Sequence, residues 1–173
     1  ELSLSLSPHR HSPPHPHNDH CVYSDLCYFP VSLISRLQGN DLTADCTEDL
    51  ASVISINLSM TELSLSRNKL GDSGVKRLCE SLRNPKCKLQ SLSLTSETST
   101  DLASALIKNR SLTELNLNRN ALGDSGVKGL CDTLRTPDRS LRKLDLGFNS
   151  FTDDSVPALH RLIKTCTSLE GIR

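Results

Sequence analysis

Hydrophobic and polar residues between positions 112 and 134 follow two different periods, one after the other. Residues 112–122 alternate apolar and polar side chains around their leucines, which is the period of a half-buried strand. Residues 127–134 space their apolar side chains at i, i+3, i+4 and i+7, which is one face of a helix. Between them lies GDSG, in which Asp124 and Ser125 are expected to supply helix-starting oxygens. We therefore predict a strand, a turn and a helix.

The same unit recurs along the chain at short, regular intervals. Its copies begin at Met60, Leu89, Leu112, Leu141 and Leu169. The first and third of these starts are 52 residues apart, as are the second and fourth, so adjacent copies behave as pairs. A unit this short cannot bury its apolar side alone, and we expect neighbouring copies to stack.

The copies share the pattern LxxLxLxxNxL at a period of 23 to 29 residues, which is the signature of leucine-rich repeats. Such repeats form a solenoid with parallel strands on the concave side, helices on the convex side and one core shared by neighbours. The predicted fold class is therefore α/β, a leucine-rich-repeat solenoid with the shape of a horseshoe segment.

Two domains are predicted. Residues 1–30 form a His/Pro/Ser-rich segment that is expected to be disordered, because it holds too little apolar surface to offset the entropy of ordering. Residues 31–173 form the leucine-rich-repeat domain, with about five repeats, of which the third is shortened and the last truncated. The chain begins at Glu1 without Met, so we expect a fragment or a processed form.

A zinc site is the alternative interpretation of the first segment, since its ligand types suit that metal. The candidate ligands are His15, His17, His20, Cys21 and Cys27. Their spacing matches no closed zinc motif, and we favour a solvated tail without metal.

Two repeats depart from the pattern. In the first, Ser32 and Ser35 stand where apolar residues are expected, so the strand is degraded; alternatively, Leu33 and Ile34 replace them in a shifted register. The third copy, counted from this degraded one, begins at Leu89 and lacks the five residues xxNxL after Leu94. Leu94 must therefore serve as either the strand leucine or the turn leucine. We predict an irregular connection there and the weakest local stability in the array.

One asparagine recurs at the position where each strand turns toward its helix. A buried amide there can pair with backbone N–H and C=O groups that the turn would otherwise leave unpaired. The repeated asparagines are predicted to form a structural ladder; they are Asn40, Asn68, Asn120 and Asn149.

No catalytic or cofactor site is predicted. GDSG resembles the nucleophile loop of chymotrypsin-like proteases, but both copies, with Ser73 and Ser125, occupy one repeat position where a turn is required. The nearest candidate base, His160, lies at least one repeat away. We expect a protein that is not an enzyme and that uses neither cofactor nor metal.

The net charge and the cysteines limit the expected partners and the expected cellular compartment. The formal net charge is zero and no apolar run is long enough to span a bilayer, so neither nucleic acid nor membrane is an expected partner. Cys79 and Cys131 lie on the apolar helix stripe and Cys46 lies at a helix start, so we expect them to act as small buried hydrophobes. The odd total of seven cysteines favours a reducing compartment, hence the cytoplasm.

The side chains between the strand leucines are predicted to face the concave side and to bind protein. The residues selected are Glu62, Ser64, Arg67, Glu114, Asn116, Asn118, Arg119, Lys143, Asp145 and Phe148, with Ser66, Ser91, Ser93 and Gly147 on the same face. Mixed charge with arginine anchors suits protein recognition, and Phe148 is the first candidate for a hot spot because it is the only aromatic residue among them.

The paired LTELxLxxNxLGDSGVKxLCxxL and DLASxL motifs resemble ribonuclease-inhibitor-type repeats and, more narrowly, the C-terminal repeats of NACHT–LRR (NOD-like) receptors. The resemblance covers residues 36–173 and implies a cytosolic sensing module of innate immunity. Its implied partners are a protein or pathogen-derived ligand on the concave face and, in a full-length receptor, the NACHT domain in cis. The alternatives are an inhibitor resembling ribonuclease inhibitor, against which the absence of Trp speaks, and a leucine-rich regulator of a GTPase, which would carry an acidic tail.

Overall fold

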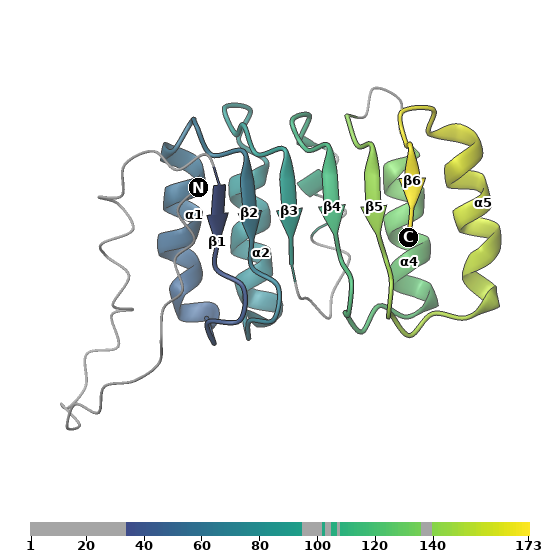
Figure 1. Cartoon of the computed structure of the whole chain (residues 1–173), viewed down its shortest axis with the longest axis horizontal. Helices are drawn as coiled ribbons and strands as arrows, with labels where there is room; N and C mark the ends of the chain where they lie inside the picture. The colour runs from purple at the N-terminus through teal and green to yellow at the C-terminus, as the bar shows by residue number, and fades with distance from the viewer. Residues whose placement is uncertain (1–33, 95–101, 103–104, 107, 136–139) are drawn as a thin grey trace.

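Six short strands lie side by side in one parallel sheet, in the same order as in the chain (Figure 1). The structure, a computed structural model, describes residues 34–94, 102, 105–106, 108–135 and 140–173. The segment 1–30, for which disorder was predicted, lies outside the described residues. The helices stand on one side of the sheet, and the opposite side, called here the open sheet face, carries none of the described helices (Figure 1). This arrangement confirms the predicted solenoid of strand–helix units.

The strands are two or three residues long and follow one another at the spacing of the repeats. Their bounds are β1 Ile34–Arg36, β2 Glu62–Ser64, β3 Ser91–Ser93, β4 Glu114–Asn116, β5 Lys143–Asp145 and β6 Gly171–Ile172. The helices between them are α1 Thr47–Ile56, α2 Gly71–Leu82, α4 Asp124–Leu134 and α5 Val156–Thr165, with short 3-10 turns η2 Ala44–Cys46 and η3 Asp153–Ser155.

The leucines of successive strands align into columns, because each strand pairs with its neighbour in the same register. Leu63, Leu92, Leu115 and Leu144 are directly paired along the sheet and are at most 2% exposed. A second column is equally buried and consists of Leu65, Leu94, Leu117 and Leu146. The apolar helix residues, such as Leu78 and Leu130, pack against these columns in one continuous core. Each repeat therefore closes the core of its neighbours.

The first strand keeps the register of the others. Its Ser35 pairs with Leu63, and Ile34 pairs with Glu62 on the neighbouring strand. Serine thus occupies the position of the first strand leucine, as expected for a degraded strand, whereas the alternative of a shifted register is wrong. The backbone bond from the Leu37 N–H to the carbonyl of Ser64 fixes this alignment.

In the shortened third repeat, Leu94 serves as the second strand leucine. Its register follows from the pairing of Leu92 with Leu115, and its N–H donates to the carbonyl of Asn116. Leu94 is fully buried, as are Leu102 and Ala105 farther along this repeat. The connection that was predicted to be irregular, residues 95–101, lies outside the described residues, and its low stability stays a prediction.

The described cysteines fall into two groups. Cys79, Cys87, Cys131 and Cys166 are buried free thiols, as expected for small core residues. Cys46 is 8% exposed and lies in the core, as expected for a small buried residue, and it is also disulfide-bonded.

The GDSG turn begins its helix differently from the prediction. Gly123 is the N-cap of α4, and no side chain caps that helix or α2. The Asp124 carboxylate instead accepts bonds from the next repeat, from the N–H of Thr152 at 2.8 Å, from the Thr152 hydroxyl at 2.9 Å and from the Ser155 hydroxyl. The aspartate therefore joins two repeats, and these bonds, led by that from Ser155, lower the pKa of Asp124 below its ordinary value of 3.8.

The last glycine of the first GDSG allows α2 to approach the preceding repeat closely. A Cβ on Gly74 would lie 2.9 Å from Cγ2 of Thr47, 3.3 Å from Cα of Ala44 and 3.3 Å from Cβ of Leu70. Thr47 is fully buried and Ala44 presents backbone, so neither can move away easily. Gly129 in α4 has no described neighbour within 4 Å of such a Cβ.

We predict that Gly74→Ala destabilises the chain and that Gly129→Ala stabilises it. Both changes remove a helical glycine, which should contribute about 0.5–1 kcal/mol of stability. At Gly74 the clash should outweigh this gain, with a net loss of about 1–2 kcal/mol. Urea unfolding followed by circular dichroism measures both values, and a stabilised Gly74→Ala variant would contradict the close approach.

We predict that Asp124 makes stability depend on acid pH. Because its folded pKa is lowered, the carboxylate stabilises the fold above its unfolded pKa, and this contribution is lost as pH falls through the folded pKa. The unfolding midpoint of Asp124→Asn should therefore fall less between pH 5 and pH 2 than that of the unchanged chain. Asp72→Asn is the matched control, since Asp72 occupies the same first-turn position in α2 and makes no side-chain bond to a described residue; an equal effect of both variants would contradict the prediction.

Candidate functional site

Polar side chains form two rows across the open sheet face, because the strands pair without stagger. Glu62, Ser91, Glu114 and Lys143 are aligned in the first row. The second row consists of Ser64, Ser93, Asn116 and Asp145. All are partly or largely exposed, whereas the leucines between the rows are buried.

Beyond each strand, the residue before the repeated asparagine has a left-handed backbone. Its φ is +58° at Arg67, +58° at Arg119 and +55° at Phe148, and Gly39 takes +70° at the same position of the first repeat. This conformation is uncommon for residues other than glycine and unusual for a bulky one. The fold thus holds three large side chains in a strained backbone at one edge of the open sheet face.

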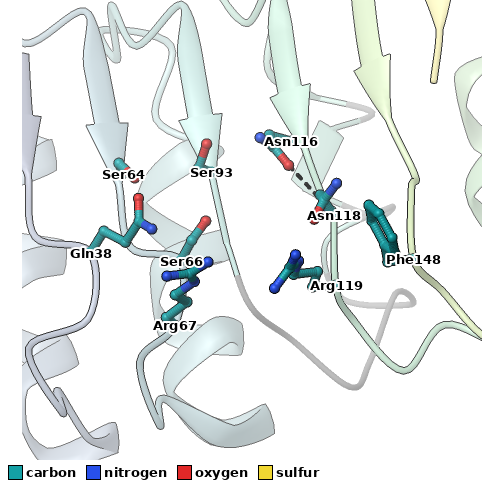
Figure 2. A pocket seen from close by; sticks show the side chains of 9 residues that line it. All are labelled: Gln38, Ser64, Ser66, Arg67, Ser93, Asn116, Asn118, Arg119 and Phe148. Carbon is teal, nitrogen blue, oxygen red and sulfur yellow. Dashed lines mark hydrogen bonds between the residues drawn. The ribbon is translucent and has the colours of Figure 1, made fainter.

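A hollow of about 330 Å³ lies between the turns that follow β2 and β4 (Figure 2). It is lined by Gln38, Ser64, Ser66, Arg67, Ser93, Asn116, Asn118, Arg119 and Phe148. Small hydroxyl and amide side chains from β2, β3 and β4 line it on the sheet side, and the two arginines come from the turns. This hollow is called the arginine hollow below.

A second hollow of about 580 Å³ lies farther along the sheet and has mixed charge. It is lined by Ser91, Ser93, Glu114, Leu115, Asn116, Lys143, Leu144, Asp145, Glu170, Gly171 and Arg173. Within it, Nζ of Lys143 lies 2.6 Å from Oε1 of Glu114. This exposed ion pair neutralises the only lysine of the lining and contributes at most about 1 kcal/mol.

The structure brings most of the predicted site residues together, in two groups. The arginine hollow gathers Ser64, Arg67, Asn116, Asn118, Arg119 and Phe148, and the second hollow gathers Glu114, Asn116, Lys143 and Asp145. Glu62 lines neither hollow, and its Oε1 lies 3.8 Å from Nε of Arg36. Gln38 was missed, because the degraded first strand hides its position beside Ser66.

Arg119 and Phe148 contact each other on the open face. The guanidinium carbon of Arg119 lies 5.1 Å from the centroid of the Phe148 ring, a cation–π arrangement. Phe148 is 78% exposed, so the ring covers the arginine without being buried itself. The backbone N–H of Arg119 donates to the carbonyl of Gly147, which ties the two turns together.

Asn68 connects two repeats from inside the turn. Its Oδ1 accepts from the N–H groups of Asn40 and Leu42, each at 3.0 Å, and its Nδ2 donates to the carbonyls of Leu37 and Leu65 at 2.8 and 2.9 Å. Three of these four groups belong to the preceding repeat. The side chain is 7% exposed, so water cannot easily replace these bonds.

The other repeated asparagines also bond to the backbone. Asn149 accepts from the N–H of Leu122 and donates to Leu117 and Leu146, which reproduces the pattern of Asn68. Asn120 is buried and donates to the carbonyl of Leu94 at 3.1 Å. Asn40 is only half-buried, and its Nδ2 reaches the carbonyl of Gln38 at 3.5 Å.

A second set of asparagines, at the helix ends, was not anticipated from the sequence. The Oδ1 atoms of Asn57, Asn84 and Asn109 each accept, at 3.0 Å, from the N–H two residues later. Asn109 is 8% exposed and also donates from Nδ2 to the carbonyl of Leu82 in the preceding repeat. The repeated spacing of these residues before Met60, Cys87 and Leu112 is the signal that would have identified them.

The serines of the two GDSG motifs and the candidate base lie on different helices. Ser73 and Ser125 are exposed in the first turns of α2 and α4, and His160 is exposed on α5. Burial raises the pKa of the Cys131 thiol to about 11, so it stays protonated at neutral pH. In the described part of the chain, no group of three His, Cys, Asp or Glu side chains could hold a metal. The candidate zinc ligands of residues 1–30 lie outside that part.

Among the described residues, no helix combines the length and the apolar character that crossing a lipid bilayer requires.

Comparison with known proteins supports the interpretation of the repeats. The family model "Leucine Rich repeat" matches residues 57–79, 108–131 and 138–159. NACHT, LRR and PYD domains-containing protein 3 of Rattus norvegicus is 47% identical over 136 residues, which is 76% of this chain. Ribonuclease inhibitor of Sus scrofa is 39% identical over 159 residues, or 86% of this chain. The chain is a leucine-rich-repeat protein homologous to NACHT–LRR proteins and to ribonuclease inhibitor.

This leucine-rich-repeat chain spans only part of those relatives. It covers 13% of the NACHT, LRR and PYD domains-containing protein 3 and 35% of the ribonuclease inhibitor. Two solved structures share its fold at low identity: the actin-binding site 2 of leiomodin-1, with a TM-score of 0.61, 16% identity and 79% of each chain covered, and the C-terminal domain of tropomodulin from Caenorhabditis elegans, with a TM-score of 0.61, 15% identity and 78% and 82% covered.

We predict that Asn68→Ala destabilises the leucine-rich-repeat chain by at least about 2 kcal/mol, because it leaves several turn N–H and C=O groups without partners. Asn40→Ala should cost less than about 0.5 kcal/mol, since its side chain makes one long, exposed bond. The midpoints of urea unfolding measure the two costs on the same repeat boundary. Similar losses in both variants would show that burial of the Asn68 amide is not the cause.

Proposed function

We propose that the chain is a non-catalytic recognition module that binds a protein or pathogen-derived ligand through its open, concave sheet face. The leucine columns and the asparagines fix the backbone, and the side chains between them are left exposed on one rigid surface. Rigid strands that present exposed side chains lose little conformational entropy on binding, which favours recognition. The homology to NACHT–LRR proteins and to ribonuclease inhibitor supports this class of function.

The observation that carries the proposal is the exposed pair of Arg119 and Phe148. A phenylalanine that is 78% exposed and has a φ of +55° costs free energy in the unbound chain without contributing a core contact. Aromatic and arginine side chains are the residues that most often dominate binding energy at protein interfaces. A partner that covers Phe148 would recover the cost of its exposure.

The resemblance to NACHT–LRR proteins supports a proposal for the cellular role. We infer a module of a cytoplasmic NOD-like receptor, in which the NACHT domain would act in cis and these repeats would sense the ligand. The chain spans a small share of such relatives, so activity of the whole receptor is outside what the module performs alone.

A protein inhibitor similar to ribonuclease inhibitor is the second candidate, and the 39% identity to that protein favours it. An assay of pancreatic-type ribonuclease activity separates the two functions. We expect no inhibition when the chain is in molar excess, and tight inhibition would favour the second candidate.

We predict that Phe148→Ala weakens partner binding about tenfold or more and leaves stability unchanged, because the ring is a contact residue outside the core. The measurement is quantitative capture of proteins from cytosolic extract on the immobilised full chain, followed by affinity measurement for the retained partner. Ile163→Ala is the matched control, since Ile163 is 58% exposed on α5, away from the open sheet face. Loss of binding in the control alone would move the interface to the helices and contradict the proposal.

A further inference from the structure

The arginine hollow differs from the rest of the open sheet face in its charge. Its described lining contains two arginines and no carboxylate. The second hollow, one strand farther along, contains Glu114, Asp145 and Glu170 beside its basic residues. The two hollows therefore select different chemical groups, although both belong to the same sheet.

Arg119 is distinguished from the other basic residues of this face by its surroundings. Lys143 is paired with Glu114 and Arg36 with Glu62. Arg119 has no acidic partner among the described residues, and its side chain contacts the ring of Phe148. A guanidinium group carries five N–H donors, and here the ring covers one of its faces while the donor edges stay accessible.

Neighbouring side chains add hydrogen-bond donors to the arginine hollow. Oδ1 of Asn116 accepts from the N–H of Asn118 at 2.9 Å, which fixes the amide and leaves its Nδ2 donors without a described acceptor. The side chain of Ser93 lies beside it, and that of Ser64 lies on the next strand beyond Ser93 (Figure 2). Figure 2 shows Arg119 extending from the turn after β4 toward the side of the hollow that Arg67 lines.

The two arginines of this hollow come from the repeats on either side of the shortened third repeat. Arg67 and Arg119 occupy the same turn position in the second and fourth repeats, and the sequence of the third repeat lacks the xxNxL residues that would supply the intervening position. The described contribution of β3 to the lining is Ser93 alone. Among the described residues, serine side chains line the space between the two matched arginines.

We propose that the arginine hollow receives a carboxylate side chain from an acidic segment of a partner protein, with Arg119 as the principal ligand and Phe148 packing beside it. The inference rests on the proposed function and specifies the chemistry of its partner. A carboxylate matches the donor fork of a guanidinium group in two parallel bonds. A hollow of about 330 Å³ accommodates a side chain with its flanking backbone. The acidic lining of the adjacent hollow disfavours a long polyanion such as nucleic acid.

The test selects ligands from a library of random short peptides displayed on phage, with the full chain as the target. We expect enrichment of peptides that contain Asp or Glu next to an apolar residue. An enriched peptide and its Glu→Gln or Asp→Asn form are then synthesised and their Kd values measured. The acidic form should bind the unchanged chain about tenfold more tightly, and Arg119→Gln should abolish that difference.

Two further variants complete the design. Arg119→Lys keeps the charge but not the planar donor fork, and it should retain only part of the preference for the acidic peptide. Lys128→Gln is the matched control, because it removes one positive charge from an exposed position on α4, on the helix side of the sheet; it should keep the full preference. Unfolding midpoints check that every variant is folded.

The outcomes separate this inference from the proposed function. Peptides that bind in a Phe148-dependent way but without any preference for an acidic residue overturn the inference and leave the proposed function standing. If no peptide binds, or if binding is insensitive to both Phe148→Ala and Arg119→Gln, the open face is not the recognition surface and both proposals fail.

Discussion

The stacking of leucines from one repeat onto those of the next is the interaction on which the whole chain depends. No single unit has enough apolar surface for a core, and each buried leucine contributes about 1.5–3 kcal/mol only when the neighbouring repeat covers it. The unstaggered parallel pairing of Leu63, Leu92, Leu115 and Leu144 makes these contacts continuous along the sheet. Because the register is the same at every strand, the polar residues between the leucines are also aligned, and the open face is a consequence of the core.

The turns after the strands place different side chains at the edge of the otherwise regular sheet. The side chains of Asn68 and Asn149 bind the backbone of their own repeat and of the preceding one, and the residue before each has a left-handed conformation. Arginine or phenylalanine at that residue is then held at the edge of the sheet. The same device that stabilises the turn also presents the side chains on which the proposed recognition rests.

The repeating part of the fold could be predicted from the sequence, because its signal is periodic. The leucine positions, the parallel strands and the residues of the open face all follow from one motif. The left-handed backbone of Arg67, Arg119 and Phe148 could not be predicted, since none of these residue types favours it. The role of Asp124 was also missed, because its bonding partners, Thr152 and Ser155, lie one repeat away and meet it only after stacking. The hollows likewise exist only between repeats.

The contacts of Asn68 and Asn149 have a direction along the chain. Each amide completes the turn of the repeat that precedes it, as Asn68 does for Leu37 and Leu42 and as Asn149 does for Leu117 and Leu122. During synthesis from the amino terminus, a turn therefore remains incomplete until the following unit has emerged from the ribosome. Loss of the two ends of the array therefore has different consequences. Removal of the final unit leaves polar groups without partners in the turn before it, whereas removal of the first unit leaves the next turn with its own amide in place.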